Sequence, residues 1–320
     1  MKILISAPYV IDDIAQIRPV LERAGLSIEL ADVKERLDEE QLLTYIEDVD
    51  GAICGDDMFT ARVLQAAAPQ LKVVSKWGTG IDSIDRQAAE ELGVQVYNTP
   101  NAFTHPVADT VMGFLLSFAR GIHLSDHNMK AGRWNKLPVR ALNECVLGVI
   151  GVGNIGSAIL ERANAFRMAT VGNDIDEAVV LENKTEMVEL DELLERSHFV
   201  SVNCDLNPTS YHLIDETAFS KMRSDAVLIN TARGAVVDEA ALVEALRNRT
   251  IAGAALDVFE DEPLPLGSPL RSMPNLLLSP HNANGGQAVR RAVHRSTIEN
   301  LFRGLGIQPP SFEFQEVDEG

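Results

Sequence analysis

The chain has 320 residues, of which 46% are hydrophobic and 23% charged, a balance typical of a globular protein with a large core. Because this length exceeds one ordinary core, we expect two domains that need neither a metal nor a disulfide for stability. The formal net charge of −19, without any basic stripe, argues against nucleic-acid binding and against anionic membranes.

Cysteine usage and the start of the chain indicate a cytoplasmic protein. Cys54, Cys145 and Cys204 lie far apart and form no CxxC motif, which suits a reducing compartment. The start MKILISAPYV is typical of a first strand rather than of a signal peptide, because Pro8 interrupts the apolar run. The most apolar helical stretch, TVMGFLLSFA at 110–119, is too short to cross a bilayer.

The first third of the chain alternates between short apolar runs and amphipathic segments. The runs predict strands at 2–7, 27–32, 51–56, 71–78 and 94–100. The amphipathic segments predict helices at 14–25, 38–48, 59–70 and 83–93. Such alternation predicts a parallel sheet with helices on both faces.

Residues 98–134 follow a different pattern, with two prolines followed by one long helix. We expect this helix to run from about Val107 to Lys130 and to stop near Gly132. Its apolar residues recur at helical spacing, among them Val107, Val111, Phe114, Leu115 and Phe118. We interpret the segment as a crossover between two domains.

From Val146 onward the alternation resumes. It predicts strands at 146–151, 168–174, 198–204, 226–232, 251–259 and 276–281, and helices at 157–166, 190–197, 216–222 and 239–249. A last helical pattern covers 285–304, and we expect the tail at 309–320 to be loosely held. The second half therefore contains a second parallel sheet.

A glycine fingerprint, GVGNIG at 151–156, follows the first strand of this second sheet. Gly151 suits the tight turn, Gly153 the close approach of a pyrophosphate, and Gly156 the packing of helix on strand, with Asn154 and Ile155 between them. Asp174 ends the next strand, where a carboxylate binds ribose hydroxyls and repels a 2′-phosphate. We therefore predict an NAD site rather than an NADP site. The alternative is a structural turn followed by a capping Asp.

Four segments in this order resemble the D-isomer-specific 2-hydroxy-acid dehydrogenase family. They are SKWGTGIDSID (75–85), the glycine fingerprint, LINTARGAVVDEAALVEAL (228–246), and LDVFEDEPLP (256–265) leading to LSPHNANGG (278–286). The stretch NTPNAFTHPVADTV (98–111) is most similar to the phosphoglycerate-dehydrogenase-like branch.

The resemblance implies an α/β fold of two Rossmann-like, doubly wound parallel-sheet domains with the active site in the cleft between them. It places a discontinuous substrate-binding domain at 1–99 plus 285–320 and the NAD-binding domain at 100–284. It also implies a homodimer.

By the same resemblance, the catalytic residues are Arg233, Glu262 and His281. A histidine can exchange the proton of a 2-hydroxy acid in both directions near neutral pH, and a carboxylate on its other nitrogen would stabilise the imidazolium. An arginine offers a planar fork to the substrate carboxylate. Taken singly, each has a structural alternative: a solvated strand-end Arg, an acidic turn residue, and a histidine at a strand end.

The resemblance also implies the binding residues. The substrate carboxylate would be bound by backbone N–H groups in the loop formed by Trp77, Gly78, Thr79 and Gly80, although Trp77 could equally be a core residue. The cofactor would be lined by Cys204, Thr231, Ala232 and Asp257, although Cys204 could also be a small core residue.

Two segments depart from the family pattern. Asn282, Ala283 and Asn284 follow the histidine where an apolar residue and a glycine are usual, and Ala288 replaces a Glu. Asp56 and Asp57, in CGDDMFT (54–60), would oppose a phosphate group, and Lys76, Arg133 or Lys136 (from a partner subunit) are candidates to compensate for them. The substrate stays open: the resemblance implies 3-phosphoglycerate first, and the alternative is another 2-hydroxy or 2-keto acid such as glyoxylate or hydroxypyruvate. A non-catalytic NAD-sensing protein is the alternative function.

Overall fold

The computed structural model describes residues 1–176, 185–312 and 314. The chain divides into two compact units. Unit 1 comprises Met1–Ala102 with Gly286–Gly320, and unit 2 comprises Phe103–Gly285. These bounds differ by only a few residues from the predicted boundaries at 99 and 285. Each unit is described below by itself.

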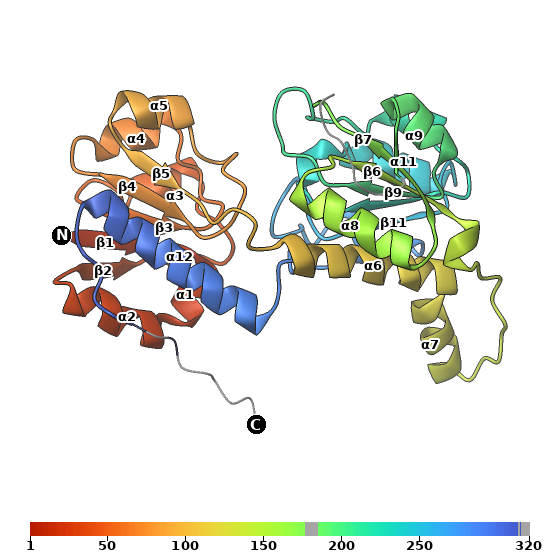
Figure 1. Cartoon of the computed structure of the whole chain (residues 1–320), viewed down its shortest axis with the longest axis horizontal. Helices are drawn as coiled ribbons and strands as arrows, with labels where there is room; N and C mark the ends of the chain where they lie inside the picture. The colour runs from red at the N-terminus through yellow and green to blue at the C-terminus, as the bar shows by residue number, and fades with distance from the viewer. Residues whose placement is uncertain (177–184, 313, 315–320) are drawn as a thin grey trace. The chain divides into compact units, whose positions relative to one another are not determined.

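Unit 1 contains a five-stranded parallel sheet in the order β2-β1-β3-β4-β5 (Figure 1). The strands are β1 (Lys2–Ile5), β2 (Ser27–Leu30), β3 (Gly51–Cys54), β4 (Val73–Lys76) and β5 (Gln95–Tyr97). The helices are α1 (Pro8–Asp12), α2 (Ile14–Arg23), α3 (Glu39–Leu43), α4 (Ala61–Ala67), α5 (Arg86–Glu91) and α12 (Gln287–Leu305).

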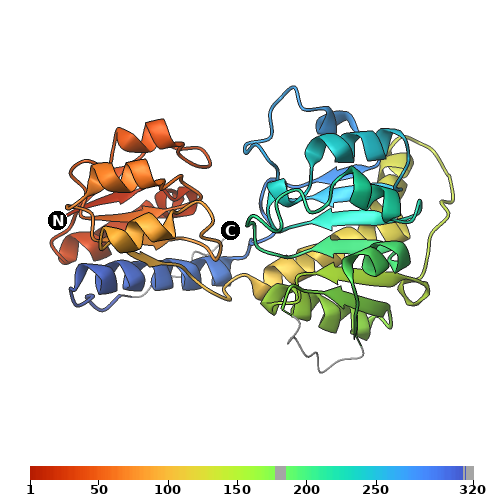
Figure 2. The same ribbon diagram turned by 90° about the horizontal axis from the view of Figure 1, so that it is seen from above.

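Helices cover both faces of this sheet because the strand residues alternate between two apolar environments. Leu4, Ala52 and Val74 pack with the buried side chains of α3, α4 and α5. On the other face, a Cβ on Gly51 would lie 2.9 Å from Leu301 of α12, so that helix packs directly on β3. Figure 2 shows α12 below the sheet and α3 to α5 above it.

Unit 2 contains a seven-stranded parallel sheet in the order β12-β11-β10-β9-β6-β7-β8. The strands are β6 (Val146–Ile150), β7 (Ala169–Asn173), β8 (Glu186–Met187), β9 (Phe199–Val202), β10 (Val227–Asn230), β11 (Gly253–Leu256) and β12 (Leu276–Leu278). The helices are α6 (Thr104–Arg120), α7 (Ile122–Lys130), α8 (Asn154–Ala165), α9 (Leu190–Arg196), α10 (Glu216–Lys221) and α11 (Glu239–Arg247), and short 3₁₀ turns lie at Leu142–Glu144, Gly234–Val236 and Pro269–Ser272.

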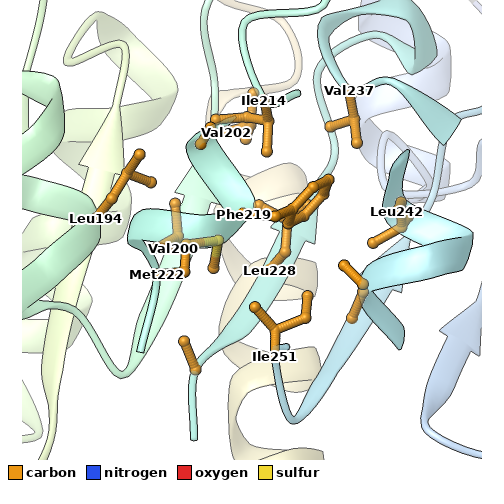
Figure 3. Packing of buried hydrophobic residues seen from close by; sticks show 14 of the residues in the cluster. Leu194, Val200, Val202, Ile214, Phe219, Met222, Leu228, Val237, Leu242 and Ile251 are labelled. Carbon is orange, nitrogen blue, oxygen red and sulfur yellow. The ribbon is translucent and has the colours of Figure 1, made fainter. Parts of the chain in front are cut away.

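Two apolar layers hold the sheet of unit 2. One lies between the sheet and α9, α10 and α11, where Phe219 packs against Leu228, as Figure 3 shows. The other lies between the sheet and α6 and α8, where Val111 and Ile159 pack against Val149. The strand order reverses between β6 and β9, so the loops that follow these two strands lie at the point where α/β sheets bind ligands. The doubly wound α/β fold expected from the sequence is confirmed.

The single long helix predicted from Val107 to Lys130 is wrong. The segment forms α6 and α7, which are bent by 59° at Gly121. Gly121 has φ of 57°, a left-handed conformation that ends a helix, and its N–H donates to the Phe118 carbonyl as a helix C-cap. Helix α1 and the two-residue strand β8 were not predicted from the sequence.

The predicted loosely held tail, 309–320, lies largely outside the described residues. Of its described part, Phe312 and Phe314 stack edge to face with ring centroids 5.5 Å apart, and Phe314 lies 5.9 Å from the ring of His294.

Among the described residues, no single helix is long and apolar enough to cross a membrane. The bent pair Thr104–Ala119 and Ile122–Lys130 passes that test by length and composition alone. Six residues of α6, including Val111 and Leu115, are buried in unit 2.

Candidate active site

The glycine loop leaves β6 at the switch point of the unit 2 sheet and leads into α8. Gly153 is the N-cap of α8, and no side chain caps the helix there. The first N–H groups of a helix have no acceptor within the helix, and together with the helix dipole they attract phosphate. The loop is therefore suited to the pyrophosphate of a dinucleotide.

The three glycines of the fingerprint meet different constraints. A Cβ on Gly151, whose φ is +84°, would lie 2.6 Å from the Cys204 nitrogen, and a Cβ on Gly156 would lie 2.1 Å from the Gly151 oxygen. Packing of the backbone therefore requires both glycines. A Cβ on Gly153 would meet no atom of the described residues within 4 Å, so the space beside it is open to a ligand. This arrangement fits a dinucleotide cofactor.

Asp174 lies directly after β7, as the motif predicts. Its Oδ2 accepts a hydrogen bond from the Val152 N–H at 2.7 Å, and its Oδ1 accepts one from the Asp176 N–H at 3.0 Å. The carboxylate thus fixes the glycine loop to the end of the neighbouring strand. Each oxygen keeps a second lone pair, so the same group can also accept hydrogen bonds from ribose hydroxyls.

The remaining residues assigned to the cofactor follow strands β9 and β10. Thr231 and Ala232 come directly after β10, and the Thr231 Oγ1 is buried without a hydrogen-bond partner in the described part of the chain. A buried hydroxyl of this kind is a polar atom that a bound ligand would satisfy. Cys204 follows β9, and burial raises the pKa of its thiol to about 11, so this cysteine is an uncharged packing residue.

The segment that carries His281 is anchored by Asp257. The His281 N–H donates to the Asp257 carbonyl at 2.7 Å. The two carboxylate oxygens of Asp257 accept from the N–H groups of Asn282 and Ala283, each at 2.9 Å. Asp257 is fully buried beneath this loop. The departure at 282–284 leaves this anchoring intact, because its donors are main-chain groups.

His281 and Glu262 form a side-chain pair. The His281 Nδ1 lies 2.9 Å from the Glu262 Oε2, and the Glu262 Oε1 accepts from the Phe259 N–H at 2.9 Å. The two side chains are only 20% and 10% exposed. Glu262 is therefore not a solvated turn residue. A carboxylate held in this position favours the protonated imidazole and fixes its orientation.

Arg233 lies three residues after β10, a neighbour of β11 in the same parallel sheet. Its Nη1 donates to the Ala232 carbonyl at 2.9 Å. The next residue, Gly234, was not singled out in the sequence. A Cβ on Gly234 would lie 1.9 Å from the Phe259 carbonyl carbon, so the turn of Arg233 packs on the backbone that leads to Glu262. β10, β11 and β12 are parallel neighbours, so the segments of Arg233 and His281 leave the same edge.

In unit 1, the loop after β4 has the form expected of a carboxylate-binding loop. The Thr99 N–H donates to the Gly78 carbonyl at 2.9 Å, and the Asn98 Nδ2 donates to the Thr79 carbonyl at 2.6 Å. Among the described residues, the N–H groups of Gly78, Thr79 and Gly80 donate to no protein acceptor. Successive main-chain N–H groups that donate to no protein acceptor are available to an anionic ligand.

The sequence predicted that both aspartates of CGDDMFT would oppose a bound phosphate, and this prediction is wrong for Asp57. Asp57 is fully buried, and it accepts hydrogen bonds from the Leu37 N–H at 2.6 Å and from the Ser6 Oγ at 2.6 Å. Desolvation raises the pKa of this carboxyl. Asp56 instead pairs with the Lys76 Nζ at 2.7 Å, and the Lys76 side chain is 3% exposed. One carboxylate is structural, and the other is neutralised by a buried ammonium.

The fold and these groups define a class of protein, the nicotinamide-dinucleotide-dependent oxidoreductases of the two-unit α/β type. The model of the D-isomer specific 2-hydroxyacid dehydrogenase NAD binding domain matches residues 112–283. A glyoxylate reductase of Thermofilum pendens is 40% identical over 87% of this chain and 85% of its own length. The chain belongs to the D-isomer-specific 2-hydroxyacid dehydrogenase family and is an NAD-dependent 2-hydroxyacid dehydrogenase.

Other relatives are named for different substrates. A hydroxypyruvate reductase of Thermotoga maritima is 34% identical over 87% of this chain and 92% of its own length. A D-3-phosphoglycerate dehydrogenase of Methanocaldococcus jannaschii is 34% identical over 95% of this chain but 57% of its own length. The D-lactate dehydrogenase of Aquifex aeolicus, solved with NAD and lactic acid, superposes with a TM-score of 0.82 at 25% identity and covers 93% of each chain.

Proposed function

We propose that this protein reduces glyoxylate, hydroxypyruvate or a similar small unphosphorylated 2-keto acid with NADH, and oxidises the 2-hydroxy acid in the reverse direction. The observation that carries the proposal is the 2.9 Å pair of His281 and Glu262. The relatives named glyoxylate and hydroxypyruvate reductases match over 85% and 92% of their own length, against 57% for the phosphoglycerate dehydrogenase. The phosphoglycerate-like specificity expected first is therefore the less well supported choice.

The chain's own residues take distinct roles in this reaction. The cofactor supplies the hydride in the reductive direction. His281 exchanges the proton of the substrate oxygen through Nε2, because its Nδ1 is bound to Glu262. Arg233 binds the carboxylate and polarises the carbonyl of the substrate. The main-chain N–H groups of Gly78, Thr79 and Gly80 also donate to the substrate carboxylate. This loop is therefore the substrate-binding element of unit 1.

The surroundings of Lys76 favour a substrate without phosphate. A phosphate carries about two negative charges near neutral pH and needs cations that are not already neutralised. The buried Lys76 ammonium, which lies close to Gly78, is paired with Asp56 at 2.7 Å. A phosphate would have to displace this carboxylate or lie against it, and both cost free energy beside a buried ammonium.

A panel of 2-keto acids tests the proposal. We expect kcat/KM for glyoxylate or hydroxypyruvate to exceed that for phosphorylated hydroxypyruvate by at least about 100-fold. The reason is that a phosphate charge without a free cation, next to the Asp56 carboxylate, costs a few kcal/mol. NADH oxidation at 340 nm gives the rates. A preference for the phosphorylated acid would contradict the proposed substrate class, and no turnover with any 2-keto acid would contradict the proposed function.

The preference for NAD over NADP is proposed to depend on Asp174. We expect Asp174→Asn to raise the relative kcat/KM for NADPH by about tenfold, because the amide keeps an oxygen for the Val152 N–H but removes the charge that repels a 2′-phosphate. Kinetics with NADH and NADPH measure the ratio. Asp176→Asn, two residues further along the chain, is the matched control, and an equal change in that variant would count against Asp174 as the determinant.

We propose that the protein is a cytoplasmic homodimer. α7 and the segment after it expose large apolar side chains, among them Ile122, Met129 and Trp134, and Trp134 is 80% exposed. Exposed apolar groups gathered on one element are typical of a protein–protein interface. Light scattering tests the dimer, since a solution mass of one 34.9 kDa chain would contradict it. The three free cysteines fit a reducing compartment.

A further inference from the structure

Trp77 connects the interior of unit 1 to the substrate-binding loop. It is the residue between β4 and Gly78, and its N–H donates to the Cys54 carbonyl at 2.8 Å. Its side chain is 6% exposed, and its ring lies 4.6 Å from the ring of Tyr9, centroid to centroid. Gly78 has φ of +142°, a conformation that side chains rarely adopt, so the main chain turns sharply directly after the buried indole.

A connected set of polar contacts holds this indole. The Trp77 Nε1 donates to the His294 Nδ1 at 3.0 Å, and the His294 Nε2 lies 2.9 Å from the Asp13 Oδ2. The same Asp13 oxygen accepts from the Arg290 Nε at 2.6 Å. Arg290 in turn donates to the Tyr9 carbonyl at 3.0 Å and lies over the Tyr9 ring at 5.0 Å. We call these five residues the indole network.

The indole network fixes the protonation state of His294. An indole N–H only donates, so the His294 Nδ1 must be unprotonated, and the proton must lie on Nε2, where it is donated to Asp13. The ring is 2% exposed, and burial lowers its pKa, although Asp13 opposes that effect. The other charged group that faces it, Arg290 on α12, also lowers its pKa.

α12 supports the same strand end at two further places. The Ser75 Oγ donates to the Thr297 carbonyl at 2.7 Å. The Asn300 Nδ2 donates to the Asn98 carbonyl at 3.0 Å, and the side chain of Asn98 holds the Thr79 carbonyl. If position 294 only had to fill space, an apolar side chain would be enough, because a buried histidine is stabilising only when its polar atoms are all satisfied. The hydrogen bonds of His294 and of α12 instead hold the strand end and the loop that follows it.

We propose that His294 is a positioning residue, which acts through the indole of Trp77 to hold the N–H groups of Gly78 to Gly80 in the arrangement that binds the substrate carboxylate. The inference rests on the proposed function of that loop. It assigns to α12 a direct part in substrate affinity. NADH affinity is independent of it, because the glycine loop belongs to unit 2.

Kinetics of three variants test this role. We expect His294→Leu and Trp77→Phe each to raise the KM for glyoxylate about fivefold to tenfold, the effect of one lost hydrogen bond, with a smaller change in kcat and an unchanged Kd for NADH. The double variant should be no worse than the worse single variant, because both remove the same contact. His198→Leu is the control, since it removes a half-buried histidine whose Nδ1 accepts from the Val146 N–H in unit 2.

A lowered melting temperature with an unchanged KM in His294→Leu would overturn the proposal, and so would additive effects in the double variant. The wild-type rate separates this failure from failure of the proposed function, which would abolish turnover before any substitution.

A spectroscopic test does not depend on turnover or on a stable Leu variant. Trp77 and Trp134 are the two tryptophans, so Trp134→Phe leaves Trp77 as the single reporter. Its emission should be quenched as His294 is protonated, with a midpoint below the ordinary histidine value of 6.5, and glyoxylate binding should shift that midpoint. Emission that is independent of pH, or a midpoint that glyoxylate leaves unchanged, would overturn the assignment.

Discussion

Replacing His281 by Asn is expected to lower kcat by about 10²–10⁴-fold while the Kd for NADH stays within about twofold, because positioned proton transfer contributes a factor of that size. His281 has φ of 49°, a left-handed conformation that Asn adopts at low cost, and its backbone bond to the Asp257 carbonyl does not need the imidazole. Asn thus removes the proton carrier and leaves the loop in place. Stopped-flow reduction of glyoxylate and a fluorescence titration with NADH give the two quantities.

Glu262→Gln is the companion variant to His281→Asn. The amide can keep the bond to the Phe259 N–H but no longer stabilises the imidazolium, so we expect a fall in kcat of about 10–10²-fold, smaller than for His281→Asn. In the double variant the loss should not exceed that of His281→Asn alone, because the carboxylate acts through the imidazole. A His281→Asn enzyme that retains more than about one tenth of the wild-type kcat would remove His281 from the mechanism.

The sequence predicted every strand except β8, because the others contain short runs of apolar residues, whereas β8 is two exposed residues, Glu186 and Met187. The prediction of one long helix failed at Gly121, because a glycine within a helical pattern can either lie inside the helix or end it. Gly113 lies inside α6 with open space around it, whereas Gly121 ends that helix. What distinguishes them is tertiary: the segment after α7 returns, so that Leu137 would lie 3.1 Å from a Cβ on Gly121 and Arg140 donates to the Ala119 carbonyl. A rule based on the spacing of residues along the sequence cannot predict that contact.

The candidate site shows the same division between local and distant causes. Gly151, Gly153 and Asp174 belong to one local motif, and their positions in the turn after β6 and at the end of β7 could be predicted from it. The anchoring of the His281 loop could not, because Asp257 reaches the Asn282 N–H across 25 residues of sequence. Resemblance suggested a cofactor contact for Asp257, and the structure adds a bond that such a comparison does not contain.

The glycine fingerprint permits a sharper separation of fold from function than any single catalytic residue. We expect Gly153→Ala to leave the melting temperature unchanged and to weaken NADH binding by at least about tenfold, or about 1.4 kcal/mol. Gly153 has extended backbone with φ of −69°, and a Cβ there meets none of the described atoms within 4 Å, so the added methyl group would occupy the space proposed for the pyrophosphate. Calorimetric titration with NADH and thermal unfolding measure the two effects.

Gly156→Ala, three residues further on, is the matched comparison. Its Cβ would lie 2.1 Å from the Gly151 oxygen, a backbone atom that cannot move without displacing the loop from β6. Overpacking of this kind costs about 1–3 kcal/mol, so both the melting temperature and NADH affinity should fall. A Gly153→Ala variant that binds NADH as tightly as the wild type would show that the cofactor does not approach this residue. The phosphate site would then have to be sought elsewhere on the edge of the sheet, and the reason for glycine at 153 would lie outside cofactor binding.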